Sequence, residues 1–81
     1  MIKVGHIYTD GEDIYVVTNV WSSVLDNKDY FCSIDTDGVV NVSNSACYAE
    51  ENDKLIAEYP TWQEAVNSKE FKGENISNPE R

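Results

Sequence analysis

The chain has 81 residues, with 15 acidic side chains against 6 lysines and arginines, and a formal net charge of −9. Its length allows one domain, and 41% hydrophobic with 26% charged residues is typical of a folded globular chain. The negative charge argues against direct contact with phosphate backbones or anionic lipid surfaces. Neither a signal peptide nor an apolar run of membrane-spanning length is recognisable, so we expect a cytoplasmic domain with two free thiols, Cys32 and Cys47.

Five short strands are predicted in the first three quarters of the chain, from runs of β-branched and aromatic residues between polar turns. We expect them over residues 2–9, 14–20, 29–35, 39–43 and 55–59, with turns over 10–13 and 36–38 and loops over 21–28 and 44–54. In strand count and spacing, residues 2–59 resemble SH3-like small barrels. The expected fold is therefore mostly β (α+β), a five-stranded antiparallel meander or SH3-like small barrel.

A short C-terminal helix is predicted where the apolar pattern changes from alternation to helical spacing. Thr61 and Glu64 form a T-x-x-E capping box, and the helix is expected over residues 61–72, ending before Gly73. We expect Trp62 and Val66 to plug one open end of the sheet. This gives a single domain over residues 1–73 and a flexible tail over residues 74–81.

A catalytic centre is not expected from the reactive side chains. His6 is the only histidine, and it could pair with Cys32 or Cys47, but a nucleophile, a base and an orienting group do not occur together. Cys32 alternates with Tyr30 and Ile34, which predicts a buried, unreactive thiol, whereas Cys47 lies in a loop and should react faster. The four glycines are scattered rather than gathered in a phosphate-binding loop, so no cofactor is expected.

The segment Ser33 to Gly38 resembles part of a calcium-binding loop, with oxygen ligands at alternate positions before a glycine. Its first ligand position holds Ser33, however, and Asn44 stands where the bidentate glutamate belongs. These departures favour an ordinary hairpin turn, and we expect no metal site.

Trp21 stands out among the aromatic residues because it is predicted at a strand end, beside Ser22 and Ser23. An exposed tryptophan there could anchor a partner protein. Alternatively, its ring folds back over the barrel and joins the core. The sequence leaves both alternatives open.

The acidic residues are concentrated in the β part of the chain. Residues 1–59 carry eleven acidic and three basic residues, whereas residues 60–81 carry four and three. Alternate turns of a meander share one end of the sheet, which predicts two acidic poles. The first acidic set comprises Asp10, Glu12, Asp13, Asp35 and Asp37. The second acidic set comprises Asp26, Asp29, Glu50, Glu51 and Asp53.

These patterns favour a non-catalytic acidic protein-binding module over an enzyme. In size and charge the chain resembles inhibitors from phages and mobile elements that mimic nucleic acid and occupy a basic cleft on a partner protein. Solvated turns that only aid solubility would give the same charge pattern. The alternative from another class is a structural or assembly subunit that self-associates through exposed strand edges, for example as a homodimer. A small metal-binding or Cys-dependent protein ranks last.

Overall fold

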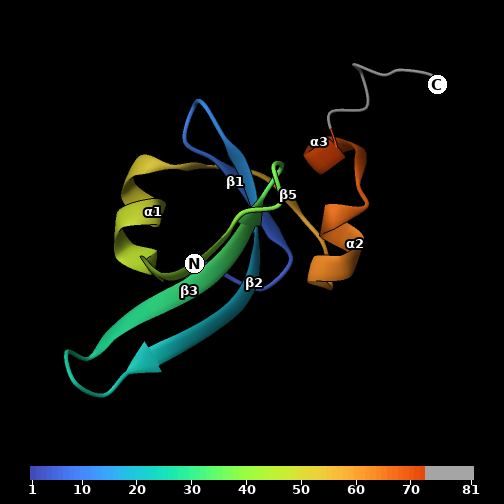
Figure 1. The fold of residues 1–81 in the computed structure, drawn as a ribbon. Helices are drawn as coiled ribbons and strands as arrows, with labels where there is room; N and C mark the ends of the chain where they lie inside the picture. The colour runs from blue at the N-terminus through green and yellow to red at the C-terminus, as the bar shows by residue number, and fades with distance from the viewer. Residues whose placement is uncertain (73–81) are drawn as a thin grey trace.

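The fold is taken from a computed structural model that describes residues 1–72. These residues form five strands and three short helices (Figure 1). In chain order the elements are β1 (His6–Thr9), β2 (Ile14–Ser23), β3 (Lys28–Asp35), β4 (Val40–Ser45), α1 (Ala46–Asn52), β5 (Lys54–Glu58), α2 (Trp62–Val66) and α3 (Lys69–Lys72).

All strand pairs are antiparallel, and the strands lie in the order β4-β3-β2-β1-β5. The first four strands follow one another as a meander, and β5 then returns to pair with β1, with Tyr8 opposite Leu55. The predicted mostly β fold with five antiparallel strands is confirmed. The sheet stays open rather than closing into a barrel, so β4 and β5 are its two edges within residues 1–72.

The sheet has a hydrophobic cluster on each face, and a helical layer covers each cluster (Figure 1). Tyr8 and Val17 face α1, whose Ala46 and Ala49 are buried against them. On the opposite face, Ile7 and Val16 pack against Ala65 of α2. Because both faces are covered, neighbouring residues along β1 and β2 are both buried, and simple apolar–polar alternation is lost.

A β-bulge in β2 keeps its apolar side chains on the α1 face. The pairing with β3 shifts between Val17 and Asn19, which leaves Thr18 as an extra residue. A single extra residue reverses the side-chain alternation. Val20 therefore joins Val17 in the cluster below α1, opposite Phe31 of β3.

Residues 46–52 form helix α1, so the predicted loop over residues 44–54 is wrong there. The Ser45 hydroxyl caps this helix by accepting a hydrogen bond from the Tyr48 backbone N–H at 3.2 Å. Ala46 and Ala49, three residues apart, form its buried side. Two small side chains give little hydropathy signal, which explains why the segment reads as a polar loop.

The C-terminal helix begins as predicted but is divided in two. The Thr61 hydroxyl accepts a hydrogen bond from the Glu64 N–H at 3.1 Å, which confirms the predicted cap. The helix breaks after Val66, and α3 starts three residues later.

The prediction that Trp62 plugs one end of the sheet is wrong. Trp62 is 37% exposed, and Ala65 makes the buried contact while Val66 is half-buried. The predicted stop at Gly73 and the tail over residues 74–81 lie outside the described residues.

We expect Thr61→Ala to lower the free energy of unfolding by about 0.5–2 kcal/mol, because the Glu64 N–H loses its acceptor. Thr61→Ser keeps a hydroxyl at the same place and is the matched control. Urea denaturation of both variants measures the difference. Equal midpoints for Thr61→Ala and the wild type would show that this cap does not stabilise the helix.

Candidate functional site

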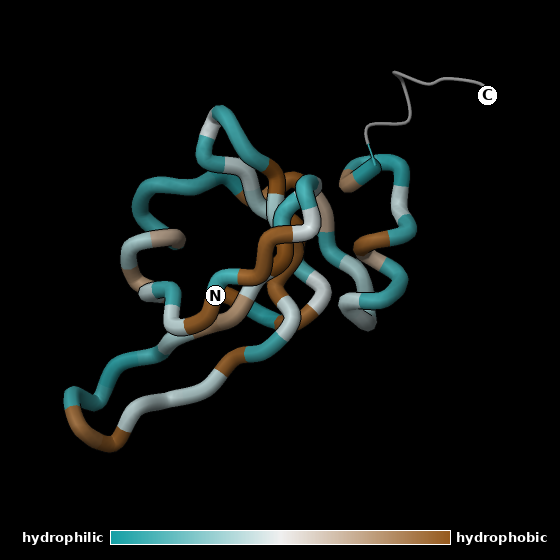
Figure 2. The backbone as a smooth tube through the Cα atoms, in the orientation of Figure 1, coloured by the Kyte–Doolittle hydropathy of each residue, from teal (hydrophilic) through white to brown (hydrophobic). Residues whose placement is uncertain are grey.

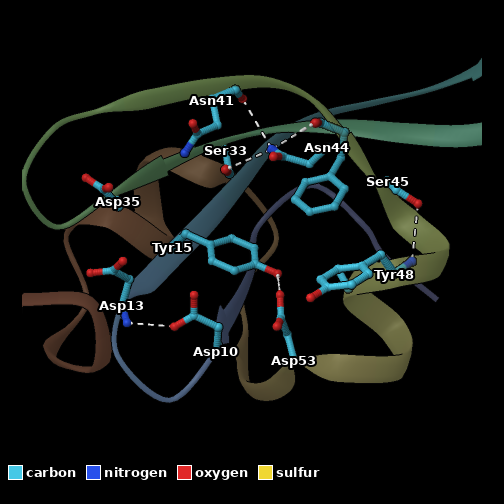
Figure 3. A pocket seen from close by; sticks show the side chains of 12 residues that line it. Asp10, Asp13, Tyr15, Ser33, Asp35, Asn41, Asn44, Ser45, Tyr48 and Asp53 are labelled. Atoms are coloured by element: carbon cyan, nitrogen blue, oxygen red, sulfur yellow. Dashed lines mark hydrogen bonds between the residues drawn. The ribbon is translucent and has the colours of Figure 1, made fainter.

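A pocket of about 240 Å³ lies at the end of the sheet where the β1–β2 turn, the end of β3 and the end of α1 meet (Figure 3). Four aspartates line it: Asp10, Asp13, Asp35 and Asp53. Its lining contains no lysine, arginine or histidine within the described residues. We call it the acidic pocket, and its uncompensated carboxylates give it a negative electrostatic potential.

Aromatic side chains form the apolar part of the acidic pocket. The Tyr15 ring stacks between Tyr8 and Phe31, with centroid separations of 5.8 Å on either side. The Tyr15 hydroxyl donates a hydrogen bond to Oδ2 of Asp53 at 2.6 Å (Figure 3). Burial and the adjacent Asp53 carboxylate raise the pKa of Tyr15, so the phenol stays protonated and holds Asp53 in place.

Backbone hydrogen bonds fix two of the four aspartates in their turns. Oδ1 of Asp10 accepts from the N–H groups of Glu12 and Asp13, at 2.9 and 2.8 Å. These hydrogen bonds lower the pKa of Asp10, so its carboxylate is ionised at neutral pH. Oδ1 of Asp35 accepts from the N–H groups of Asp37 and Val39, both at 3.0 Å. The charges at the pocket mouth therefore sit on ordered turns.

Uncharged polar residues from β4 form the wall opposite the β1–β2 turn (Figure 3). Nδ2 of Asn44 donates to the Phe31 carbonyl and to Oγ of Ser33, both at 3.2 Å. Asn41 lines the same wall, and the 65% exposed Tyr48 of α1 stands at the rim. A ligand in the pocket would meet carboxylates on one side and amides and an aromatic ring on the other.

The structure brings most of the first acidic set together. Asp10, Asp13 and Asp35 line the acidic pocket, and Glu12 and Asp37 are exposed on the two turns beside it. These positions agree with the shared sheet end that the meander predicts.

The second acidic set is divided. Asp29, Glu50 and Glu51 line a second hollow beside α1, together with Lys28, and Asp26 lies at the turn between β2 and β3. Asp53 was assigned to the wrong pole: it lines the acidic pocket with the first set. Helix α1 is the reason, because it carries the chain from the β4 edge across the sheet and delivers Asp53 to Tyr15.

Trp21 lies within β2 rather than in a loop, because β2 continues to Ser23 and the predicted loop over residues 21–28 shrinks to four residues. Its ring is half-buried and stacks on Tyr30 of β3 at a centroid distance of 6.0 Å. The structure therefore matches neither of the two positions predicted for Trp21. The ring is not fully exposed as an anchor would be, and it does not belong to either buried cluster. The Trp21–Tyr30 pair stiffens the hairpin instead.

The reactive side chains lie apart from the acidic pocket. His6 is buried in β1, burial lowers its pKa, and its Nδ1 has no hydrogen-bond partner among the described residues. Cys47 is exposed on α1 as expected, but the prediction of a buried Cys32 is wrong. Cys32 does share a strand face with Tyr30 and Ile34, yet it is half-buried, and the fully buried residues of β3, Phe31 and Ser33, lie on its other face.

The Ser33–Gly38 segment forms the end of β3 and a hairpin turn. No group of three or more His, Cys, Asp or Glu in residues 1–72 is placed to hold a metal ion. Of the helices within this range, none has the length and apolar character needed to cross a membrane.

Comparisons with protein-family models, curated proteins and solved structures find no match to this chain. The function must therefore be inferred from the arrangement of the residues themselves. The acidic pocket is the strongest candidate, because it combines like charge, ordered carboxylates and an aromatic wall in one concave place.

Proposed function

We propose that this protein is a non-catalytic protein-binding module whose acidic surface occupies a basic cleft on a partner protein. The observation that carries the proposal is the acidic pocket, where aspartates from three separate elements converge without a basic side chain in the lining. Like charges repel and cost stability when gathered in a folded protein. A surface that keeps them together is suited to a partner that supplies the opposite charge.

The pocket matches the chemistry of a lysine or arginine side chain. Carboxylates accept charge-assisted hydrogen bonds from these cations, and an aromatic ring next to them favours a cation electrostatically. Asp10 and Asp35 are held by their turns, and Asp53 is held by Tyr15. Binding therefore requires little ordering of these side chains, which preserves more of the interaction free energy.

The partner class follows from the total charge. At −9 over 81 residues, the domain is suited to a cleft rich in lysine and arginine, of the kind that binds nucleic acid through its phosphates. Carboxylates would then occupy positions where phosphates normally sit. The protein would act as an inhibitor by mimicry, without direct contact to nucleic acid.

Competition between this protein and nucleic acid tests the proposal. A partner captured with the full chain from a lysate is purified, and its binding to a labelled DNA or RNA duplex is followed by fluorescence anisotropy. We expect the protein to displace the duplex, with an affinity that falls between 0.1 and 1 M salt as the Debye length shortens from about 10 to about 3 Å. A salt-independent affinity, or a duplex that stays bound, would contradict the proposal.

A second candidate, self-association through a strand edge, is favoured by the composition of β4. Residues 38–49 contain no charged side chain, and Val39, Val40 and Val42 are 52–69% exposed along this edge. An uncharged edge would allow two acidic copies to approach and pair their strands. Sedimentation in low and high salt separates the candidates, because a dimer formed by edge pairing persists in high salt.

A further inference from the structure

The hairpin of β2 and β3 projects beyond the body of the domain and carries an apolar tip (Figures 1 and 2). Its tip residues Val24 and Leu25 are 95% and 94% exposed. No other large hydrophobic residue among residues 1–72 is exposed to this extent. The acidic pocket lies elsewhere, so the function proposed above does not explain this feature.

The hairpin tip is ordered by its own hydrogen bonds. The Asn27 N–H donates to the Ser23 carbonyl at 2.9 Å, and Asn27 takes the left-handed conformation with φ of 59°. The Leu25 N–H donates to Oγ of Ser23 at 3.2 Å, and the Lys28 N–H donates to Oδ1 of Asp26 at 3.1 Å. Below the tip, the stacked Trp21 and Tyr30 rings brace the two strands.

The turn does not need its two apolar residues. Serine, aspartate and asparagine supply the hydrogen bonds and the left-handed position that such a turn requires, and they stand at Ser23, Asp26 and Asn27. Val24 and Leu25 add no burial to the folded chain, because both are almost wholly exposed. An ordered protrusion with an apolar end has the form of an anchor that enters a pocket on another molecule.

We infer that Val24 and Leu25 insert into an apolar pocket whose rim is basic, on the same protein partner that the acidic pocket contacts. This inference rests on the proposed function for the identity of the partner. Charge complementarity supports it, because Asp26 and Asp29 flank the tip and Lys28 is the single base between Val20 and Gly38. The Ser22 hydroxyl donates to Oδ1 of Asp29 at 2.6 Å and holds that carboxylate beside the tip.

A second copy and a lipid bilayer fit the tip less well. Two tips meeting would bring Asp26 and Asp29 of each copy together at close range, which is unfavourable. The same carboxylates are repelled by anionic lipid headgroups, and two aliphatic side chains provide little apolar area for stable membrane attachment. A pocket with a basic rim satisfies both the apolar and the acidic groups.

Photo-crosslinking locates the occupant of the tip. A benzophenone amino acid is placed at position 25 of the full chain, and at position 62 as a control, because Trp62 is exposed on α2 and does not line the acidic pocket. After irradiation in a lysate, we expect position 25 to crosslink to a protein with a basic surface. Crosslinks only to a second copy, or none above the control, would overturn the inference.

The contribution of the tip is measured with the crosslinked protein after purification. We expect V24S/L25S to weaken its affinity by roughly 10- to 1,000-fold through faster dissociation, from the loss of two buried side chains. The control variant W62S removes an exposed apolar side chain of α2, away from the acidic pocket, and should bind within about threefold of wild type, the range of a surface substitution. The salt dependence should be unchanged in V24S/L25S, because no charge is altered.

These results separate the tip from the acidic pocket. An unchanged affinity of V24S/L25S overturns the tip inference, whereas a wild-type affinity that ignores salt overturns the acidic-pocket proposal alone. Phosphatidylcholine vesicles provide the lipid test. If wild type sediments with them and V24S/L25S does not, the tip is a lipid anchor and the inference is wrong.

Discussion

Replacing the four pocket aspartates with asparagine (D10N/D13N/D35N/D53N) is expected to weaken binding to the basic partner on the order of 10- to 100-fold. Each substitution removes a negative charge but keeps a carbonyl oxygen. The turns held by Asp10 and Asp35, and the hydrogen bond from Tyr15, therefore keep their acceptors. The loss should be mainly in the association rate, since charge steers the encounter between two proteins.

Surface plasmon resonance at two salt concentrations measures this loss, with circular dichroism to verify folding. The control is the pair of amide substitutions E50Q/E51Q on α1, which leaves the acidic residues of the hairpin tip intact. Because Lys28 lines the hollow beside Glu50 and Glu51, we expect a smaller loss per charge removed from the control. A larger loss from the control would assign the binding surface to the hollow instead of the acidic pocket. Melting temperatures verify that both variants stay folded. In the pocket variant the relief of like-charge repulsion is opposed by the loss of the ionised Asp10 carboxylate, whose lowered pKa shows that it favours the folded state.

Gly5→Ala is expected to lower the free energy of unfolding by about 3 kcal/mol or more, a large part of the 4–12 kcal/mol typical of a chain this long. Gly5 has φ of +93°, and a Cβ there would lie 2.1 Å from the Tyr59 carbonyl oxygen. The backbone of Gly5 also links β2 to the residue that follows β5, donating to the Val17 carbonyl at 2.9 Å and accepting from the Tyr59 N–H at 3.0 Å. The chain cannot move away from the added methyl group without breaking these bonds.

Gly38→Ala is the matched control for Gly5→Ala. Gly38 also has a positive φ, of +83°, but an added Cβ would meet no atom within 4 Å. Its substitution carries only the conformational penalty, about 1 kcal/mol. Guanidinium denaturation compares the two variants, and similar losses would show that the close approach to Tyr59 is unimportant.

The sequence predicts the strands well where turn chemistry marks their ends. Asp10 and Gly11 mark the first turn, and Asp37 and Gly38 mark the turn before β4. It fails where the decisive contact is distant in the chain. Neither face of the sheet is open to solvent, so both Val16 and Val17 are buried although they are neighbours in the chain. Their sequence therefore does not show which helical layer each one contacts.

The same two factors, turn chemistry and distant contacts, explain why only part of the candidate site could be predicted. Asp10 and Asp35 could be grouped from meander topology alone, because each stands at the end of a strand where a turn begins. Asp53 could not, since its hydrogen bond to Tyr15 spans 38 residues and depends on the unpredicted helix α1. Val24 and Leu25 lay in a predicted loop, where nothing indicated that the strands would continue and lift them away from the body.

The two-sided core has a consequence for hydrogen exchange. Strands β1 and β2 pack against α1 through Tyr8 and Val17 and against α2 through Ile7 and Val16. If either helical layer opens, the same two strands remain covered on their other face. Their amides should therefore exchange only when the whole domain unfolds, while amides of the edge strand β4 exchange through local opening. The central strand pair thus sets the slowest exchange rate and reports the global stability of the molecule.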